Sequence, residues 1–257
     1  MKRNLTAIFS LCIVFFSYIN VVGARPGTPP AEITFVYTPY LTEALRLNPS
    51  WGRRLDFIQK TIQTQLQEIR YTIDEYDSPR TKRRARAKQY LKTVLGEYYD
   101  RSSERRARTF QHILSNIEHM DSTITLDGPM KPRVPDMWVD LGSGGRIYLA
   151  QGFFTDPTLE DWFRVYMLLR ETFRATIPQY AQKFALGRYD GRTGSAAVRP
   201  LFPGQRIASG ETEVNGYTDY RQILKQRTGA DVFPYSPDLI PLMGYCFTNK
   251  GEMPVDA

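Results

Sequence analysis

The sequence predicts a mixed α+β fold in one domain, with long N-terminal helices, a small sheet and a buried helix. Three observations support this prediction. Apolar residues recur every three or four positions through the N-terminal half, which is the period of an amphipathic helix. After Asp121 the pattern changes to the two-residue alternation of half-buried strands. The segment from Trp162 to Phe173 is apolar almost all round, which is typical of a helix packed on both sides.

Residues 1–24 are predicted to be a cleavable secretory signal peptide. Lys2 and Arg3 supply a positive start, Leu5 to Phe16 is a short apolar core, and Val22-Gly23-Ala24 has the small residues of a cleavage site. The core is too short to span a bilayer, and no later run approaches the roughly 18 apolar residues that a span needs. We therefore expect a secreted, extracellular product with no membrane span.

Three regions are expected after the signal. Residues 25–50 form an N-terminal lead, in which Ile33 to Tyr37 alternates like a short strand. Residues 51–228 are predicted to be the main domain, and residues 229–257 a Pro-rich C-terminal tail with few packing signals. The chain is long enough to bury a full hydrophobic core, which favours a single domain.

The formal net charge of the chain is +7, and it has two cysteines. Cys12 leaves with the signal, so Cys246 has no intramolecular partner and no disulfide framework is expected. We interpret Cys246 as a buried structural thiol, with a disulfide-linked dimer as the alternative.

Three helices are predicted in the N-terminal half. The first runs from Trp51 to Tyr76 with Ser50 as its cap, because its apolar side chains recur at steps of three and four. A second covers Thr81 to Tyr99, and a third covers Ser103 to Met120 with its apolar residues on one face.

Alternating side chains then predict three strands: Ser122–Leu126, Met137–Leu141 and Arg146–Phe154. Asp156 and Pro157 are typical of a helix start, so a helix is expected from there to about Thr176. A Gly-rich stretch follows, and one further helix is expected from about Thr218 to Arg227.

The apolar helix contains the segment Arg170-Glu171-Thr172-Phe173-Arg174. Residues 170 and 174 are four apart, so their side chains leave the same face of the helix. In metallopeptidases such a position holds HExxH, whose two histidines bind one zinc ion while the glutamate acts as general base. Here arginine stands at both histidine positions.

With its surroundings, this motif resembles that of the aspzincin metallopeptidases, the family of deuterolysins and fungal lysine-specific metalloendopeptidases. The resemblance covers about Leu55 to Lys225 and implies a zincin-like fold. In that family HExxH is followed by G-T-x-x-D-x-x-Y-G, whose aspartate is the third zinc ligand. The segment Gly187 to Gly194 aligns Asp190 with that ligand, although Thr193 replaces the tyrosine.

The resemblance implies that Glu171 is a vestigial general base and that Arg170, Arg174 and Asp190 occupy the positions of the zinc ligands. A guanidinium stays protonated and offers no lone pair, so neither arginine can bind a metal. Without a metal, nothing lowers the pKa of a water molecule for Glu171 to deprotonate. We therefore expect no metal and no cofactor at this site.

Charge balance predicts another role for the two arginines. We expect Arg170 or Arg174 to pair with Glu171 or Asp190 in a buried salt-bridge cluster. The alternative is that both arginines lie on the solvated face of an ordinary amphipathic helix.

A second candidate is the basic stretch from Arg80 to Arg108, which holds eleven Lys or Arg residues against three acidic ones. Its densest part consists of Arg80, Lys82, Arg83, Arg84, Arg86 and Lys88. Such density is typical of surfaces that bind nucleic acid or another polyanion, and also of solvated helix faces that bind nothing.

Three functions follow. The favoured one is a secreted, catalytically inactive aspzincin-like protein that binds a protein or peptide partner. The first alternative is an active secreted metalloendopeptidase, which would need zinc and a ligand set that the sequence does not reveal. The second alternative is a binder of nucleic acid or an anionic surface through the basic stretch.

Overall fold

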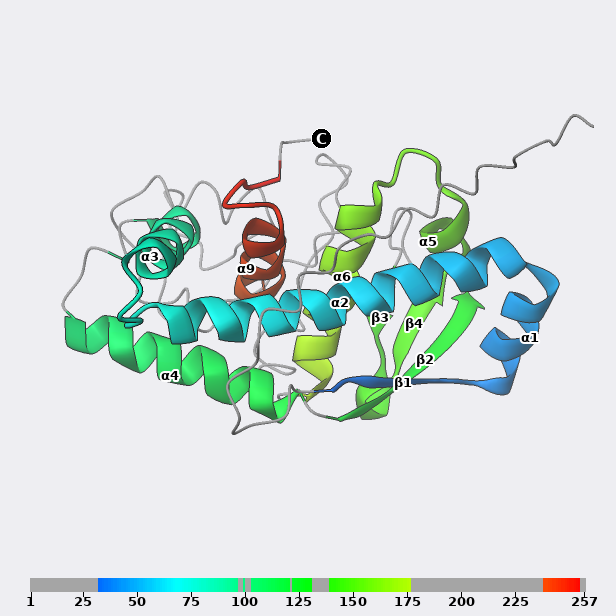
Figure 1. The fold of residues 1–257 in the computed structure, drawn as a ribbon. Coiled ribbons are helices and arrows are strands. Elements are labelled where there is room, and N and C mark those ends of the chain that lie inside the picture. The colour runs from blue at the N-terminus through cyan, green and yellow to red at the C-terminus, as the bar shows by residue number, and fades with distance from the viewer. Residues whose placement is uncertain are drawn as a thin grey trace, which may run out of the picture.

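The computed structural model describes residues 32–96, 99, 103–120, 122–130, 139–176 and 238–254. These residues form a mixed α+β fold, in which a four-stranded sheet lies beside a group of helices (Figure 1). In chain order the elements are β1 (Thr34–Tyr37), α1 (Pro39–Leu47), α2 (Pro49–Glu75), α3 (Thr81–Leu95), α4 (Ser103–His119), β2 (Thr123–Met130), β3 (Val139–Leu141), the short 3-10 helix η2 (Ser143–Gly145), β4 (Ile147–Ala150), α5 (Gln151–Thr155), α6 (Asp161–Thr176) and α9 (Leu239–Thr248). The α+β prediction is confirmed at this level.

The sheet has the strand order β1-β2-β4-β3. β1 runs parallel to β2 with Thr34 opposite Thr123, and β2 runs parallel to β4 with Leu126 opposite Ile147. α1 to α4 lie between β1 and β2 in the chain, as expected for parallel neighbours, which need a long connection. β3 is antiparallel to β4, because the glycine turn between them reverses the chain.

The predicted strand Arg146–Phe154 is wrong in its second half. β4 ends at Ala150, and the next five residues form α5. Phe153 and Phe154 are both buried, and Phe154 stacks on Trp51 of α2 with ring centroids 4.9 Å apart. Consecutive residues of a strand point to opposite faces, whereas one helical turn brings both rings to the core.

The long helix α2 confirms the periodicity prediction. Its fully buried apolar side chains follow steps of three and four: Leu55, Ile58, Ile62, Leu66 and Ile69. It begins at Pro49 after Asn48, so the expected cap Ser50 lies inside the first turn. Proline is favoured there because its fixed φ suits a helix and the first N–H has no partner to lose.

The lead 25–50 contains a helix that we did not predict. α1 begins with Pro39, and its cap Thr38 accepts a hydrogen bond from the Leu41 N–H. The Thr38 hydroxyl also donates to Asp127 of β2 at 2.6 Å, which ties the helix start to the sheet. A threonine followed by proline is a helix-start signal that the sequence analysis passed over.

The C-terminal stretch is also different from the prediction. It holds α9, whose residues Leu239 to Gly244 are all buried, together with Cys246 and Phe247. α9 packs against α2, α3 and α6, and Figure 1 shows it (red) across α2. The prediction of few packing signals is wrong, because a helix without a polar face shows no helical period and a Pro-rich composition is typical of a loop.

Several predictions fall on residues outside the described ranges. These are the signal peptide, the Gly-rich stretch that contains Asp190, and the helix from Thr218 to Arg227. Among the helices that the structure describes, none has both the length and the apolar character needed to cross a bilayer.

Candidate functional site

The motif helix α6 lies in the centre of the molecule. Every residue from Arg164 to Arg174 is buried, and α6 packs on β3 and β4 of the sheet and on the helices α2 and α9. This burial confirms the prediction that both sides of the helix are packed. It also places the motif where charged side chains must find partners inside the protein.

Within α6, Glu171 bridges the two arginines. Its Oε1 lies 2.5 Å from Arg170 Nη1, and its Oε2 lies 2.5 Å from Arg174 Nη1. No side chain of the three is more than 5% exposed. The predicted buried pairing with Glu171 is confirmed, and the alternative of a solvated arginine face is wrong.

The second carboxylate of the cluster is Asp238, which the sequence analysis did not single out. Its Oδ1 lies 2.7 Å from Arg170 Nε and accepts a hydrogen bond from the Tyr166 hydroxyl at 2.5 Å. Asp238 is fully buried and directly precedes α9, where the positive end of the helix dipole favours a carboxylate. The signal in the sequence was an acidic residue directly before ten mostly apolar residues. It does not identify the partner, because Arg170 is 68 positions away.

We refer to Tyr166, Arg170, Glu171, Arg174 and Asp238 as the ionic cluster. Burial acts to lower the pKa of Arg170, but the charges of Asp238 and Glu171 outweigh it, so this pKa is raised above its ordinary value. Burial and the charge of Asp238 raise the pKa of Tyr166 well above its usual value. The cluster thus sets two guanidinium groups against two carboxylates, and its phenol stays neutral.

The ionic cluster does not have the donor set of a zinc site. Arg170 and Arg174 supply only N–H donors, and both already bind carboxylates. Among the described residues, no three His, Cys, Asp or Glu side chains gather as metal ligands. His112 is half-buried in α4 and burial lowers its pKa, while His119 is exposed with Nδ1 2.6 Å from the carbonyl oxygen of Ser115.

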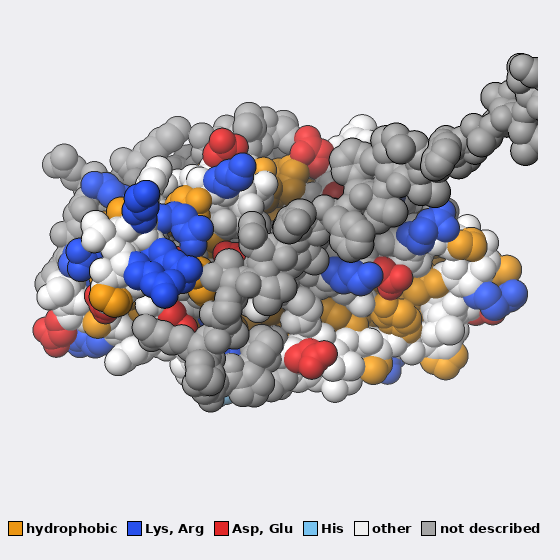
Figure 2. Space-filling model, in the orientation of Figure 1, with side chains coloured by type: hydrophobic (Ala, Val, Ile, Leu, Met, Phe, Trp, Pro, Cys, Tyr) orange, Lys and Arg blue, Asp and Glu red, His pale blue; other side chains and the backbone are white. Residues whose placement is uncertain are grey.

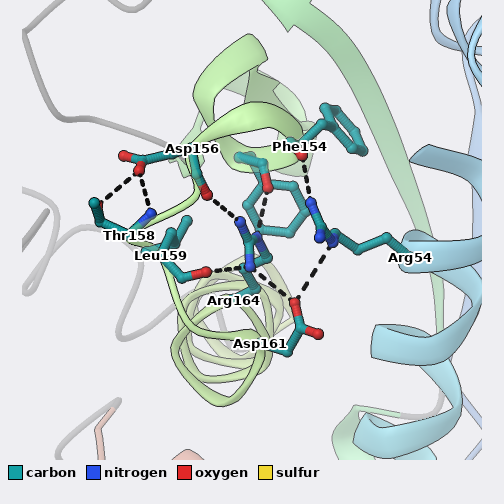
Figure 3. Close-up of polar contacts among 8 residues, drawn as sticks. Arg54, Phe154, Asp156, Thr158, Leu159, Asp161 and Arg164 are labelled. Atoms are coloured by element: carbon teal, nitrogen blue, oxygen red, sulfur yellow. Dashed lines mark hydrogen bonds and ion pairs between the residues drawn. The ribbon is translucent and has the colours of Figure 1, made fainter. Parts of the chain in front are cut away.

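A separate polar network fixes the start of α6. The buried guanidinium of Arg164 donates to three main-chain carbonyl oxygens, those of Phe153, Asp156 and Leu159 (Figure 3). Its Nη1 also lies 2.8 Å from Asp161 Oδ1, and Asp161 in turn lies 3.5 Å from Arg54 of α2. Arg164 thus holds the α5–α6 connection in place and satisfies carbonyls that would otherwise be buried without a donor.

The expected helix start at Asp156 is therefore displaced. Asp156 Oδ1 accepts hydrogen bonds from the N–H and the hydroxyl of Thr158, which forms a local turn before the helix. α6 itself begins at Asp161. Aspartate favours both a helix cap and such a turn, so the sequence alone did not separate them.

The basic stretch lies mainly on α3. Figure 2 shows Lys and Arg side chains gathered over this helix. Arg83 and Arg86 bind the buried carboxylate of Glu75 at 3.4 and 2.9 Å, so these two have a structural role. The other four predicted basic residues are exposed: Arg80, Lys82, Arg84 and Lys88.

Cys246 belongs to α9, and its thiol is free and lies in the interior of the protein. It is fully buried, and this burial raises its pKa to about 12. The interpretation of Cys246 as a buried thiol is confirmed.

The chain finds no match among protein-family models, curated proteins or solved structures. The resemblance to aspzincins therefore stays a prediction carried by the motif residues.

Proposed function

We propose that the chain is a secreted binding protein on a zincin-like scaffold, in which an ionic cluster has replaced a zinc site and hydrolysis is lost. One observation carries the proposal: the residues at the two histidine positions, Arg170 and Arg174, are buried and bound to the glutamate of the same motif. Glu171 therefore accepts hydrogen bonds from guanidinium groups and has no metal-activated water to act upon.

Charge supports this interpretation. An aspzincin site holds a zinc dication beside a glutamate and an aspartate. The ionic cluster holds two guanidinium cations beside Glu171 and Asp238, so the sum of charges is the same. Such a replacement keeps the interior neutral while removing every lone pair at the former histidine positions. A protein or peptide bound in the former substrate cleft would then remain uncut.

The experiment is a zinc titration of the purified chain, followed by metal analysis after gel filtration. We expect no stoichiometric zinc and no cleavage of a denatured protein substrate. A chain that retains one zinc ion and loses proteolysis on addition of a chelator would overturn the proposal and favour an active metalloendopeptidase.

A matched pair of variants sharpens this test. The double change Arg170→His and Arg174→His restores the two imidazoles, and we predict measurable zinc affinity. Arg170→Gln with Arg174→Gln removes the same two charges without adding a ligand and should bind no zinc. Adding Asp238→Asn or Asp190→Asn to the histidine variant then identifies the aspartate that completes the site.

A further inference from the structure

The distribution of charges along α3 destabilises this helix. Six of its fifteen residues are Lys or Arg, none is acidic, and its first turn contains Lys82, Arg83 and Arg84. The N-terminal end of a helix carries the positive end of its dipole, so cations there are repelled and destabilise the helix. The residue before the helix, Arg80, makes no side-chain cap hydrogen bond, and it stands four positions from Arg84, a spacing at which like charges repel.

Only part of this cost is offset by contacts within the protein. Arg83 and Arg86 bind Glu75, and the Lys88 ammonium lies 5.3 Å from the centre of the Tyr76 ring. Within the described ranges, no carboxylate lies at ion-pair distance from Arg80, Lys82 or Arg84. Functional sites are where a sequence typically departs from the local preferences of a helix without a stabilising contact in compensation.

The positions of these residues form a row. Arg80, Arg84 and Lys88 follow steps of four, so they share one side of α3 and are separated by about 6 Å of rise per step. Lys82 adds a further exposed cation near the same end of the helix. A narrow row of cations suits a linear polyanion, and guanidinium groups bind sulfate or phosphate oxygens in pairs.

The remaining side chains of α3 narrow the choice of ligand. Its large apolar residues Leu91, Val94 and Leu95 are buried with Ala87, and the exposed Ala85 offers only a methyl group, so α3 has no large apolar side chain to insert into a bilayer. Tyr90 stacks on Phe247 of α9 with ring centroids 6.0 Å apart, so it does not offer a free face to a nucleic-acid base. Recognition at this surface therefore depends on charge and not on apolar or aromatic contact.

We propose that the exposed cations at the start of α3 bind a sulfated polysaccharide: the row of Arg80, Arg84 and Lys88, together with Lys82 near the same end of the helix. The preference for a glycan over duplex nucleic acid rests on the proposed secretion of the chain, whereas the binding face itself rests only on the structure. The proposal is independent of the ionic cluster, because the zinc test and the binding test use different readouts.

The test measures heparin affinity of the full chain by calorimetry over a range of salt concentrations. The triple change Arg80→Gln, Lys82→Gln and Arg84→Gln should weaken binding at least about tenfold and reduce the slope against log salt by about three. The control removes three exposed cations elsewhere, Arg46→Gln, Arg53→Gln and Lys60→Gln, and should bind within about twofold of the original chain. Equal losses in both triples would overturn the proposal, because binding would then follow net charge alone.

Two further measurements test the proposed glycan binding: the melting temperature of the variant and the affinity of the chain for other polyanions. The α3 triple should melt at a higher temperature than the original chain, by about 1 to 3 °C, because it removes repulsion and charges at the wrong end of the helix dipole. A lower melting temperature would show that these cations stabilise the fold and would overturn the argument. Tighter binding to duplex DNA, or to phosphatidylserine vesicles, than to heparin at the same salt concentration would refute the assignment to a sulfated glycan.

Discussion

The replacement of Glu171 by glutamine tests the ionic cluster most directly. Glu171→Gln keeps the size of the side chain but removes the charge that both arginines share at 2.5 Å. Arg170 retains Asp238, whereas Arg174 loses its carboxylate, and its Nε already lacks a hydrogen-bond partner among the described residues. The variant therefore leaves an uncompensated cation in the core.

Breaking a buried ion pair in this way costs about 3 to 5 kcal/mol of unfolding free energy. For a chain of this size, each kcal/mol corresponds to about 2 to 4 °C in melting temperature, so we expect a decrease of roughly 6 to 20 °C. Urea denaturation followed by circular dichroism measures the free energy, and calorimetry measures the melting temperature.

The matched control is Glu43→Gln on α1. Glu43 also accepts two hydrogen bonds from an arginine, Arg46, both at 2.7 Å, but both side chains are more than half exposed. Water screens this pair, so its loss should leave the unfolding transition almost unchanged. If Glu171→Gln lost no more stability than Glu43→Gln, burial would not strengthen the cluster and the reasoning would be refuted.

Two further predictions concern α9. Gly244→Ala would place a Cβ 2.7 Å from the side chain of Gln65 and should lower stability by about 1 to 3 kcal/mol, whereas Gly52→Ala in α2 meets nothing within 4 Å and should raise it by about 0.5 to 1 kcal/mol. Urea denaturation checks both, and a loss in both variants would contradict the packing argument. In a Cys12→Ala chain, Cys246 should resist a thiol reagent at pH 8 until the protein unfolds, because its pKa of about 12 leaves almost no thiolate. Rapid labelling of the native protein would show that α9 is not buried as described.

The elements with a clear hydrophobic period were predictable from sequence. α2 and α4 follow steps of three and four because one face packs and the other meets water. α9 was missed for the opposite reason, since all its sides are packed and no polar face remains to reveal a period. The strand prediction fails over α5 because Phe153 and Phe154 favour strands locally, whereas in the folded protein Phe154 stacks on Trp51 from within a helix.

The candidate site was predictable only within one helix. Arg170, Glu171 and Arg174 lie within four positions of one helix. Helix geometry therefore brings their side chains close together, and their pairing could be predicted. Asp238 and Tyr166 complete the cluster through a contact between α6 and the start of α9, far apart in the chain. Local pattern carries no information on such a contact, which depends on how the helices pack.

The position of α9 also has a consequence for how this protein is made. Gly244 of α9 lies against the side chain of Gln65 of α2, which is about 180 positions earlier in the chain. Because contacts between distant residues form late and slowly, a ribosome that has synthesised α2, α3 and α6 has not yet delivered the segment that covers them. The growing chain must keep those apolar faces protected until α9 has been translated, and a premature stop before residue 238 would release an incomplete, aggregation-prone core.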